Sequence, residues 1–138
     1  MSMKVLTSQH LIMNEDLNHH GTLYAGRSAE WFVEAGFIAA ATLTSPDHIV
    51  CLQIHGMSFK RPVHLGEIVR YESLVALTGR TKIVTYIQMM VKDESVVDGF
   101  VTFINVDAEG VPVPHGIQVA AETEAEAALQ ERARRLFD

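Results

Sequence analysis

The sequence predicts an α+β fold in which an antiparallel sheet of about five strands wraps around one long buried helix, with an amphipathic helix at the C-terminus. Three observations predict this fold. One segment near the N-terminus is apolar with helical spacing, the next four segments alternate with a period of two, and only short turns separate those four. The chain has 138 residues, a length typical of one domain, so we expect a single domain over residues 1–138.

The first half of the fold is expected as a strand, a loop and a helix. Residues 3–12 predict the strand, and residues 14–22, which are polar and rich in turn formers, predict the loop. Residues 27–41 carry apolar side chains at spacings of three and four, and Glu34 is the only charged residue from Trp31 to Ala41. A helix that is apolar nearly all round is a buried helix.

The second half is expected as four strands, a crossing and a helix. The strands are rich in β-branched and aromatic residues and are predicted at residues 49–59, 67–77, 82–92 and 99–107. Residues 110–118 form an extended crossing that contains proline, and residues 120–136 a helix whose acidic start and basic end suit the helix dipole. Because such a sheet has an exposed edge, we expect two copies of the chain to associate.

Composition excludes several classes of protein. A net charge of −6 argues against nucleic-acid binding, because no positive field covers the surface. The single cysteine, Cys51, lies in an apolar run, excludes a disulfide within the chain and is expected to be a small buried hydrophobe. No apolar run approaches about 18 residues, so we expect no membrane span, and the cytoplasm is the expected location.

Five motifs in a fixed order resemble those of one known family. They are the loop Asn18–Gly26, the helix segment Trp31–Ala35, the stretch Phe59–Glu67, the turn Gly79–Thr81, and Phe100–Phe103 with the turn at Asp107 and Gly110. Together they resemble the hot-dog acyl-CoA thioesterases over roughly residues 5–115, which implies the hot-dog fold and hydrolysis of an acyl-coenzyme A thioester. Two details depart from the family pattern: Ala25 replaces the first glycine of a pair, and the usual position of the acid is Val33, one residue before Glu34.

The resemblance and the residue chemistry together suggest three catalytic residues. A carboxylate in an apolar helix has a raised pKa or needs partners, so Glu34 suits a general base or a nucleophile. The amide of Asn18 can hold a water molecule or the thioester oxygen. A helix that starts near Arg27 leaves N–H groups around Gly26 free to stabilise an oxyanion. The structural alternatives are a polar stripe in which Glu34 lies beside Glu30 and pairs with Arg27, a turn asparagine at position 18, and an ordinary helix entry at Gly26.

The substrate and the partner subunit are expected to contact the following parts of the chain. The turn Gly79–Thr81 resembles the turn that lies near the coenzyme A phosphates in the family, and we call it the phosphate-binding turn. Residues of the loop, basic residues and this turn are expected to bind substrate: Ala25, His20, Tyr24, Lys60, Arg61, Gly79, Arg80 and Thr81. In relatives the asparagine and the acid of one site come from opposite subunits, which implies a homodimer or a dimer of dimers, with the acyl chain running between the helix and an apolar surface of the partner. No cofactor is expected beyond the coenzyme A of the substrate, and His19 with His20 lacks the further spacing of a metal site.

Two other functions remain open from the sequence. Asp16–His20 begins like the motif of enoyl-CoA hydratases on the same fold, although His19 replaces its proline and Gly21 stands where its histidine belongs. The displacement of the acid from Val33 to Glu34 also fits an acyl-CoA-binding protein that kept the fold and lost the chemistry.

Overall fold

The helices and strands follow one another in the predicted order in a computed structural model, which describes residues 1–138. The elements are β1 (Leu6–Leu11), η1 (Asn14–Asp16), α1 (Ala25–Ala41), η2 (Pro46–His48), β2 (Ile49–Phe59), β3 (Ile68–Thr78), β4 (Lys82–Val91), β5 (Glu94–Asn105) and α2 (Glu124–Arg135). The largest difference from prediction is the start of β5, five residues before residue 99. Val91 pairs with Glu94, so the turn is only Lys92–Asp93, and Lys92 adopts a left-handed φ of 53°.

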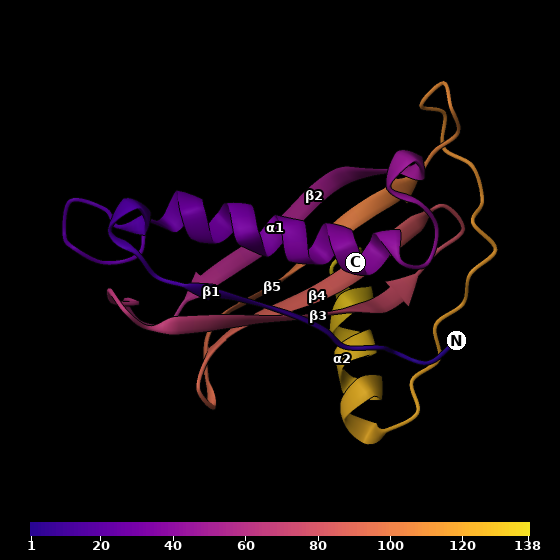
Figure 1. The fold of residues 1–138 in the computed structure, drawn as a ribbon. Coiled ribbons are helices and arrows are strands. Elements are labelled where there is room, and N and C mark those ends of the chain that lie inside the picture. The colour runs from indigo at the N-terminus through magenta and orange to yellow at the C-terminus, as the bar shows by residue number, and fades with distance from the viewer.

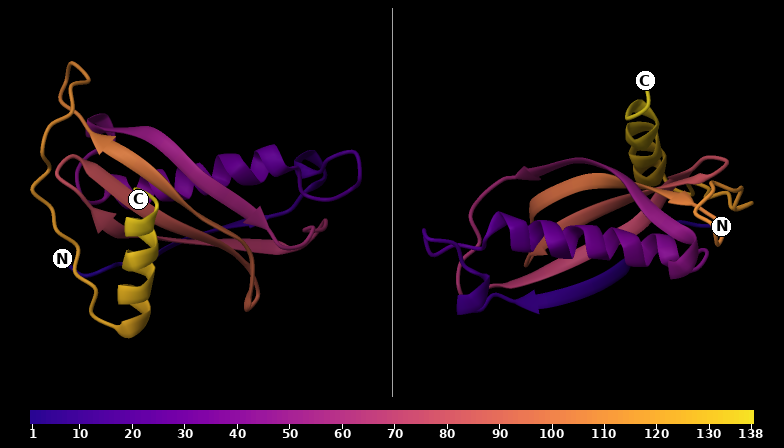
Figure 2. Two further views of the ribbon diagram at one scale, coloured as in Figure 1. Left: turned by 180° about the vertical axis from the view of Figure 1, so that it is seen from behind. Right: turned by 90° about the horizontal axis from the view of Figure 1, so that it is seen from above.

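One five-stranded sheet contains all the strands, in the order β1-β3-β4-β5-β2, and every neighbouring pair is antiparallel. The sheet curls around α1, which lies along its concave face (Figures 1 and 2). The predicted arrangement of sheet and helix is therefore confirmed. We call the face that α1 covers the inner face and the opposite one the outer face.

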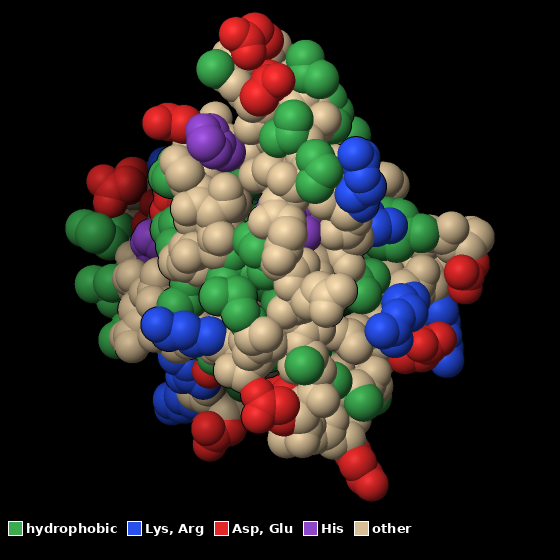
Figure 3. All heavy atoms as spheres, turned by 90° about the vertical axis from the view of Figure 1, so that its right-hand side faces the viewer, with side chains coloured by type: hydrophobic (Ala, Val, Ile, Leu, Met, Phe, Trp, Pro, Cys, Tyr) green, Lys and Arg blue, Asp and Glu red, His purple; other side chains and the backbone are tan.

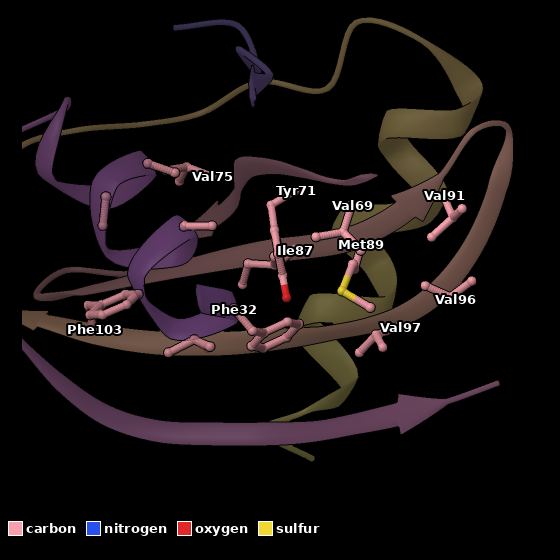
Figure 4. Packing of buried hydrophobic residues seen from close by; sticks show 14 of the residues in the cluster. Phe32, Val69, Tyr71, Val75, Ile87, Met89, Val91, Val96, Val97 and Phe103 are labelled. Atoms are coloured by element: carbon pink, nitrogen blue, oxygen red, sulfur yellow. The ribbon is translucent and has the colours of Figure 1, made fainter. Parts of the chain in front are cut away.

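The core lies between α1 and the inner face. Phe32, Ala35, Ala39 and Ala40 of the helix are buried against valine, isoleucine and aromatic side chains of the sheet (Figure 4). Small residues bring the two layers close together. A Cβ atom at Gly36 would lie 2.8 Å from Thr85 Oγ1 and 2.9 Å from Ile87 Cδ1, so only glycine fits there without a shift.

Helix α2 covers part of the outer face, on the side of the sheet away from α1 (Figure 2). Ala133 of this helix packs on Ala76, Val84 and Phe100. The helix is stabilised by acidic residues at its start and basic residues at its end. It is also capped by Thr123, whose Oγ1 accepts a hydrogen bond from the backbone N–H of Glu126.

Two burial predictions are wrong for the single chain. Cys51 is exposed, because β2 is an edge strand that pairs only with β5. Helix α1 is buried on one side only, and Glu30, Glu34 and Ile38 face solvent on the other. An apolar composition did not reveal that the sheet wraps around only part of the helix.

The edge strand β2 also contains a β-bulge that the sequence pattern did not predict. Cys51 pairs with Phe103, an inner-face core residue, whereas His55 pairs with Phe100 on the outer face. A bulge between Cys51 and Gln53 shifts the alternation, so Cys51 and His55 face opposite sides of the sheet, although an unbroken strand would place them on the same side. None of the helices combines the length and the apolar character that a membrane crossing requires.

Candidate active site

The loop before α1 is held in a defined shape by backbone hydrogen bonds. Asn18 N donates to Thr22 O at 2.7 Å, and Leu23 N donates to Val63 O at 2.8 Å. Gly21, with a φ of +80°, makes the reversal between them. The second bond fixes the loop to the segment between β2 and β3, so two parts of the chain far apart in sequence meet at the start of α1.

The side chain of Asn18 takes part in that loop. Its Oδ1 accepts the backbone N–H groups of His20 at 2.8 Å and of Thr22 at 3.2 Å, while its Nδ2 donates to Thr22 Oγ1 at 3.1 Å. The structural role considered for this residue is therefore real. The carbonyl oxygen of the amide is committed to the loop, and one N–H of the amide nitrogen remains to donate to a ligand.

The start of α1 offers two further donors. The helix begins at Ala25, two residues before the predicted start, and the carbonyl of Tyr24 accepts the N–H groups of Arg27 and Ser28. The N–H groups of Ala25 and Gly26 have no acceptor in the chain. The exposed ring of Tyr24 lies against Gly26, where an added Cβ would come within 3.0 Å of its hydroxyl oxygen.

Asn18 and the helix start open onto one cavity of about 410 Å³. Lys60 and Arg61 also line it, so the structure brings together four of the predicted site residues: Asn18, Ala25, Lys60 and Arg61. Val63 and Met89 form the buried part of its lining. The cavity thus combines polar groups at the helix start with an apolar interior.

Glu34 is exposed and lies apart from this cavity within the single chain. The prediction of apolar surroundings for its carboxylate is therefore wrong for one chain alone. Arg27 binds Asp16 at 3.3 Å and Glu30 at 3.8 Å rather than Glu34. At a rise of about 1.5 Å per residue, Glu34 lies roughly 13 Å along the helix axis from Ala25.

Of the two basic residues at the cavity, Arg61 is already engaged. It binds the Glu67 carboxylate through two nitrogens at 3.2 and 3.3 Å and Glu94 through Nε at 3.1 Å. Hydrogen bonding to Glu67 raises the pKa of the Arg61 guanidinium and lowers that of the Glu67 carboxyl. Lys60 makes two long contacts, of 3.4 Å with Ser95 Oγ and of 3.9 Å with Asp98, so it is the freer of the two.

The predicted phosphate-binding turn, Gly79–Thr81, lies at the opposite end of the molecule from the loop, beside a second cavity of about 630 Å³. Arg80 is exposed and makes no ion pair, and His115 of the crossing also lines this cavity. Figure 3 faces this end of the molecule, where basic side chains are separated by acidic and hydrophobic ones. Arg80 is therefore a locally free cation rather than part of a broad positive field.

The paired histidines of the loop stack on each other, with ring centroids 3.9 Å apart. Both are exposed, and His20 does not line the cavity beside Asn18. No group of three or more histidine, cysteine, aspartate or glutamate residues is gathered in the chain in a way that could hold a metal ion.

A buried polar group beneath the helix start was not foreseen. Ser28 Oγ lies 3.2 Å from the Tyr71 hydroxyl and donates to Met89 Sδ at 3.7 Å. Burial raises the pKa of Tyr71 to about 12, so its hydroxyl stays protonated and donates to Ser28 O. These residues come from three elements and no short motif links them, so only the tertiary structure reveals the group.

Comparisons with known proteins agree on one family. A family model described as the thioesterase superfamily matches residues 20–97. The uncharacterized acyl-CoA thioester hydrolase YkhA of Bacillus subtilis (strain 168) is 26% identical over 124 residues, which cover 86% of this chain and 71% of YkhA.

Solved structures give the same picture. A hexameric acyl-CoA thioesterase has a TM-score of 0.84 at 26% identity, covering 95% of this chain and 86% of that one. An acyl-CoA hydrolase from Bacillus cereus has a TM-score of 0.82 at 25% identity, covering 96% and 84%. The likeness extends over nearly the whole chain, including both helices.

Proposed function

The chain belongs to the thioesterase superfamily, and we propose that it hydrolyses the thioester of an acyl-coenzyme A to a free acid and coenzyme A. YkhA and the two solved relatives are named as acyl-CoA hydrolases or thioesterases, which supports this reaction. The observation that carries the proposal is the pair of free N–H groups at Ala25 and Gly26, next to the Asn18 amide. Donors in this arrangement suit an oxygen that becomes negatively charged.

The reaction adds water across the carbon–sulfur bond. A water oxygen attacks the carbonyl carbon while a carboxylate takes a proton from the water. The carbonyl oxygen gains charge and is held by the N–H groups of Ala25 and Gly26 with the free N–H of Asn18. The carbon–sulfur bond then breaks, and the coenzyme A thiolate takes up the proton that the carboxylate held.

We assign the proton-accepting carboxylate to Glu34 of a second subunit. A general base must lie within about 3 Å of the proton that it takes, directly or through one water. Glu34 of the same chain is too far along α1 from Ala25 to meet that need. A second copy whose α1 runs in the opposite direction beside the first would supply it, and the same contact would remove Glu34 from bulk water.

The surface for such a contact is the free edge of the sheet. Strand β2 pairs with β5 on one side only, and it exposes the apolar residues Val50, Leu52 and Ile54. Unpaired strand edges with apolar side chains associate readily with another strand. A dimer along β2 therefore covers the edge and completes two sites together.

Larger assembly follows the relatives. One of the solved relatives is named as hexameric, so we propose that three such dimers associate, rather than the dimer of dimers expected from the sequence. The cytoplasm remains the proposed location, since a protein with one unpaired thiol suits a reducing compartment.

The same dimer brings a free cation to the substrate. Arg80 lies at the end of the molecule opposite Asn18. In an antiparallel dimer, Arg80 of one subunit therefore approaches the site that contains the loop of the other subunit. We assign to Arg80, Gly79 and Thr81 the contact with the coenzyme A phosphates, because a guanidinium suits phosphate geometry. Arg61 is bound to two carboxylates and is not part of this assignment.

The change Glu34→Gln tests the proposal. It removes the proton acceptor and keeps the shape of the side chain, so we expect kcat for acyl-CoA hydrolysis to fall at least about 100-fold. The matched control is Glu30→Gln, one turn earlier on the same exposed side of α1, which should keep near wild-type activity. Activity is measured as release of free thiol, which a hydratase acting on an enoyl-CoA would not produce. Wild-type turnover in the Glu34 variant would remove this residue from the mechanism.

A further inference from the structure

The cavity at the start of α1 has a polar mouth and an apolar floor. Asn18 and Ala25, which hold the thioester oxygen in the proposed reaction, line the same space as Leu23, Val63 and Met89. Val63 is 3% exposed and Met89 1% exposed, so both contribute only the surface that faces the cavity. The space thus leads from the reacting carbonyl into the hydrophobic core.

Met89 ends this space within the core. It lies on the inner face of β4, opposite Tyr71 and Val97, and Figure 4 shows its side chain among these core residues. Its sulfur accepts a hydrogen bond from Ser28 Oγ at 3.7 Å, which fixes the end of an otherwise flexible side chain. Met89 belongs to the main core cluster, so other buried side chains pack behind it.

The size of the cavity limits what can enter. Its volume of about 410 Å³ is in the lower part of the range of about 300–1000 Å³ for ligand pockets. Part of it lies at the open, polar mouth beside Lys60. A short apolar group therefore fits the floor, whereas a long one would have to displace Met89 or turn back towards solvent.

We propose that this cavity binds the acyl group of the substrate and that Met89 limits the acyl chain to lengths shorter than dodecanoyl. The proposal rests on the proposed function and names its substrate class: aliphatic acyl groups without a charge at the far end. It places the chain inside the subunit that holds the thioester oxygen, between the loop before α1 and the sheet. That differs from the sequence expectation, which placed the chain against the partner's surface.

The test compares Met89→Ala with Met90→Ala. Met90 is the next residue of β4 and faces outwards, paired with Arg70 and Ser95 across a bulge, so it is a matched control. Values of kcat/KM are measured for saturated acyl-CoAs from butyryl to dodecanoyl. We expect the wild type and the Met90 variant to lose efficiency at the same chain length. The Met89 variant should accept chains longer by two or more carbons, with a gain on the order of fourfold for each methylene that finds room.

Unchanged dependence on chain length in a folded Met89 variant would overturn the proposal, and so would a wild type that hydrolyses dodecanoyl-CoA as efficiently as hexanoyl-CoA. Because Met89→Ala removes core volume, circular dichroism and gel filtration are recorded first. If that variant does not fold, Met89→Val takes its place and should shift the limit in the same direction by a smaller amount.

A separate measurement distinguishes this proposal from the proposed function. Thioether analogues, in which an alkyl chain is attached to the coenzyme A sulfur, bind without being hydrolysed. If the wild type releases no thiol from any acyl-CoA, the proposed function fails. The cavity proposal then stands if calorimetry shows that the affinity for these analogues rises with alkyl chain length up to a limit, and that Met89→Ala moves this limit to longer chains. The proposal fails if the length of the alkyl chain has no effect on affinity.

Discussion

Arg61 binds two carboxylates that come from different parts of the chain. Glu67 follows it in the segment between β2 and β3, and Glu94 opens β5. The Glu67 carboxylate also accepts the backbone N–H of His64 at 2.8 Å. These contacts hold the segment that forms one wall of the acyl cavity, so Arg61 positions that wall.

The Arg61–Glu67 pair predicts a pH dependence of stability. Hydrogen bonds from Arg61 and from the His64 backbone lower the pKa of Glu67 in the folded protein below its ordinary 4.5. A carboxyl with a lowered pKa stabilises the fold above the unfolded pKa, and this contribution is lost as the pH falls through the folded pKa. We expect Glu67→Gln to reduce the free energy of unfolding by about 1 kcal/mol at pH 7. Urea denaturation should show the variant and the wild type converging as the pH is lowered below 4.5.

The control for that measurement is Glu94→Gln. Glu94 is more exposed and makes one contact with Arg61, so its loss should matter less at every pH. A difference between the Glu67 variant and the wild type that stays constant from neutral to acid pH would show that the charge of Glu67 does not stabilise the fold.

At the scale of residues, the sequence predicted features that depend on neighbours along the chain but not those that depend on tertiary contacts. The loop around Asn18 is local, so its turn residues and its polar character could be recognised along the chain. The partners of Arg61 and the exposure of Glu34 depend on segments that meet only in three dimensions. A charged residue in an apolar helix has two outcomes, burial or a solvent-facing stripe, and the contact with the sheet decides between them.

The strands are interrupted where other elements need to contact them. Ala76 is the extra residue in a bulge between Val75 and Leu77 on β3. The side chain of Gln130, buried in α2, donates through Nε2 to Ala76 O at 3.1 Å and to Val119 O at 3.1 Å. One amide therefore fastens the C-terminal helix both to the irregular point of the sheet and to the crossing that precedes the helix.

We expect Gln130→Ala to destabilise the fold by about 1–3 kcal/mol, because it leaves two carbonyl oxygens without this donor in a buried place. The control is Gln118→Ala, an exposed side chain on the crossing, which should change stability by less than about 0.5 kcal/mol. Urea denaturation at one fixed protein concentration gives both values, since association adds to apparent stability. Equal effects of the two changes would mean that Gln130 does not anchor α2.

At the scale of elements, periodicity predicted the number, order and type of the main helices and strands, because period two and the helical spacing of apolar residues each reflect burial of one side. The bounds were less secure. Glu94–Val97 belongs to β5 although polar residues around position 94 favoured a turn, and the bulge after Cys51 placed His55 on the opposite face from Cys51. Bulges change the alternation without leaving a mark in composition.

At the scale of the whole molecule, one chain separates the groups that the proposed reaction needs together. The loop before α1, with Asn18, lies at one end of the molecule, and the turn between β3 and β4, with Arg80, lies at the other (Figure 1). Glu34, in the middle of α1, is exposed. One chain therefore presents parts of a site rather than a complete one. The proposed two-fold dimer along β2 would resolve this, because it would place the opposite end and the helix of the second copy beside each loop.

Mixing two inactive variants tests the shared site directly. We expect Asn18→Ala and Glu34→Gln each to have little activity alone. When the two chains are co-expressed with different tags and associate at random, half of the dimers are mixed and each contains one site with both residues intact, so about a quarter of wild-type activity should return. A control mixture of Glu34→Gln with the double variant contains no intact site and should stay inactive. If Asn18 and Glu34 instead acted from the same subunit, every site in the first mixture would lack one of them and thiol release would not recover.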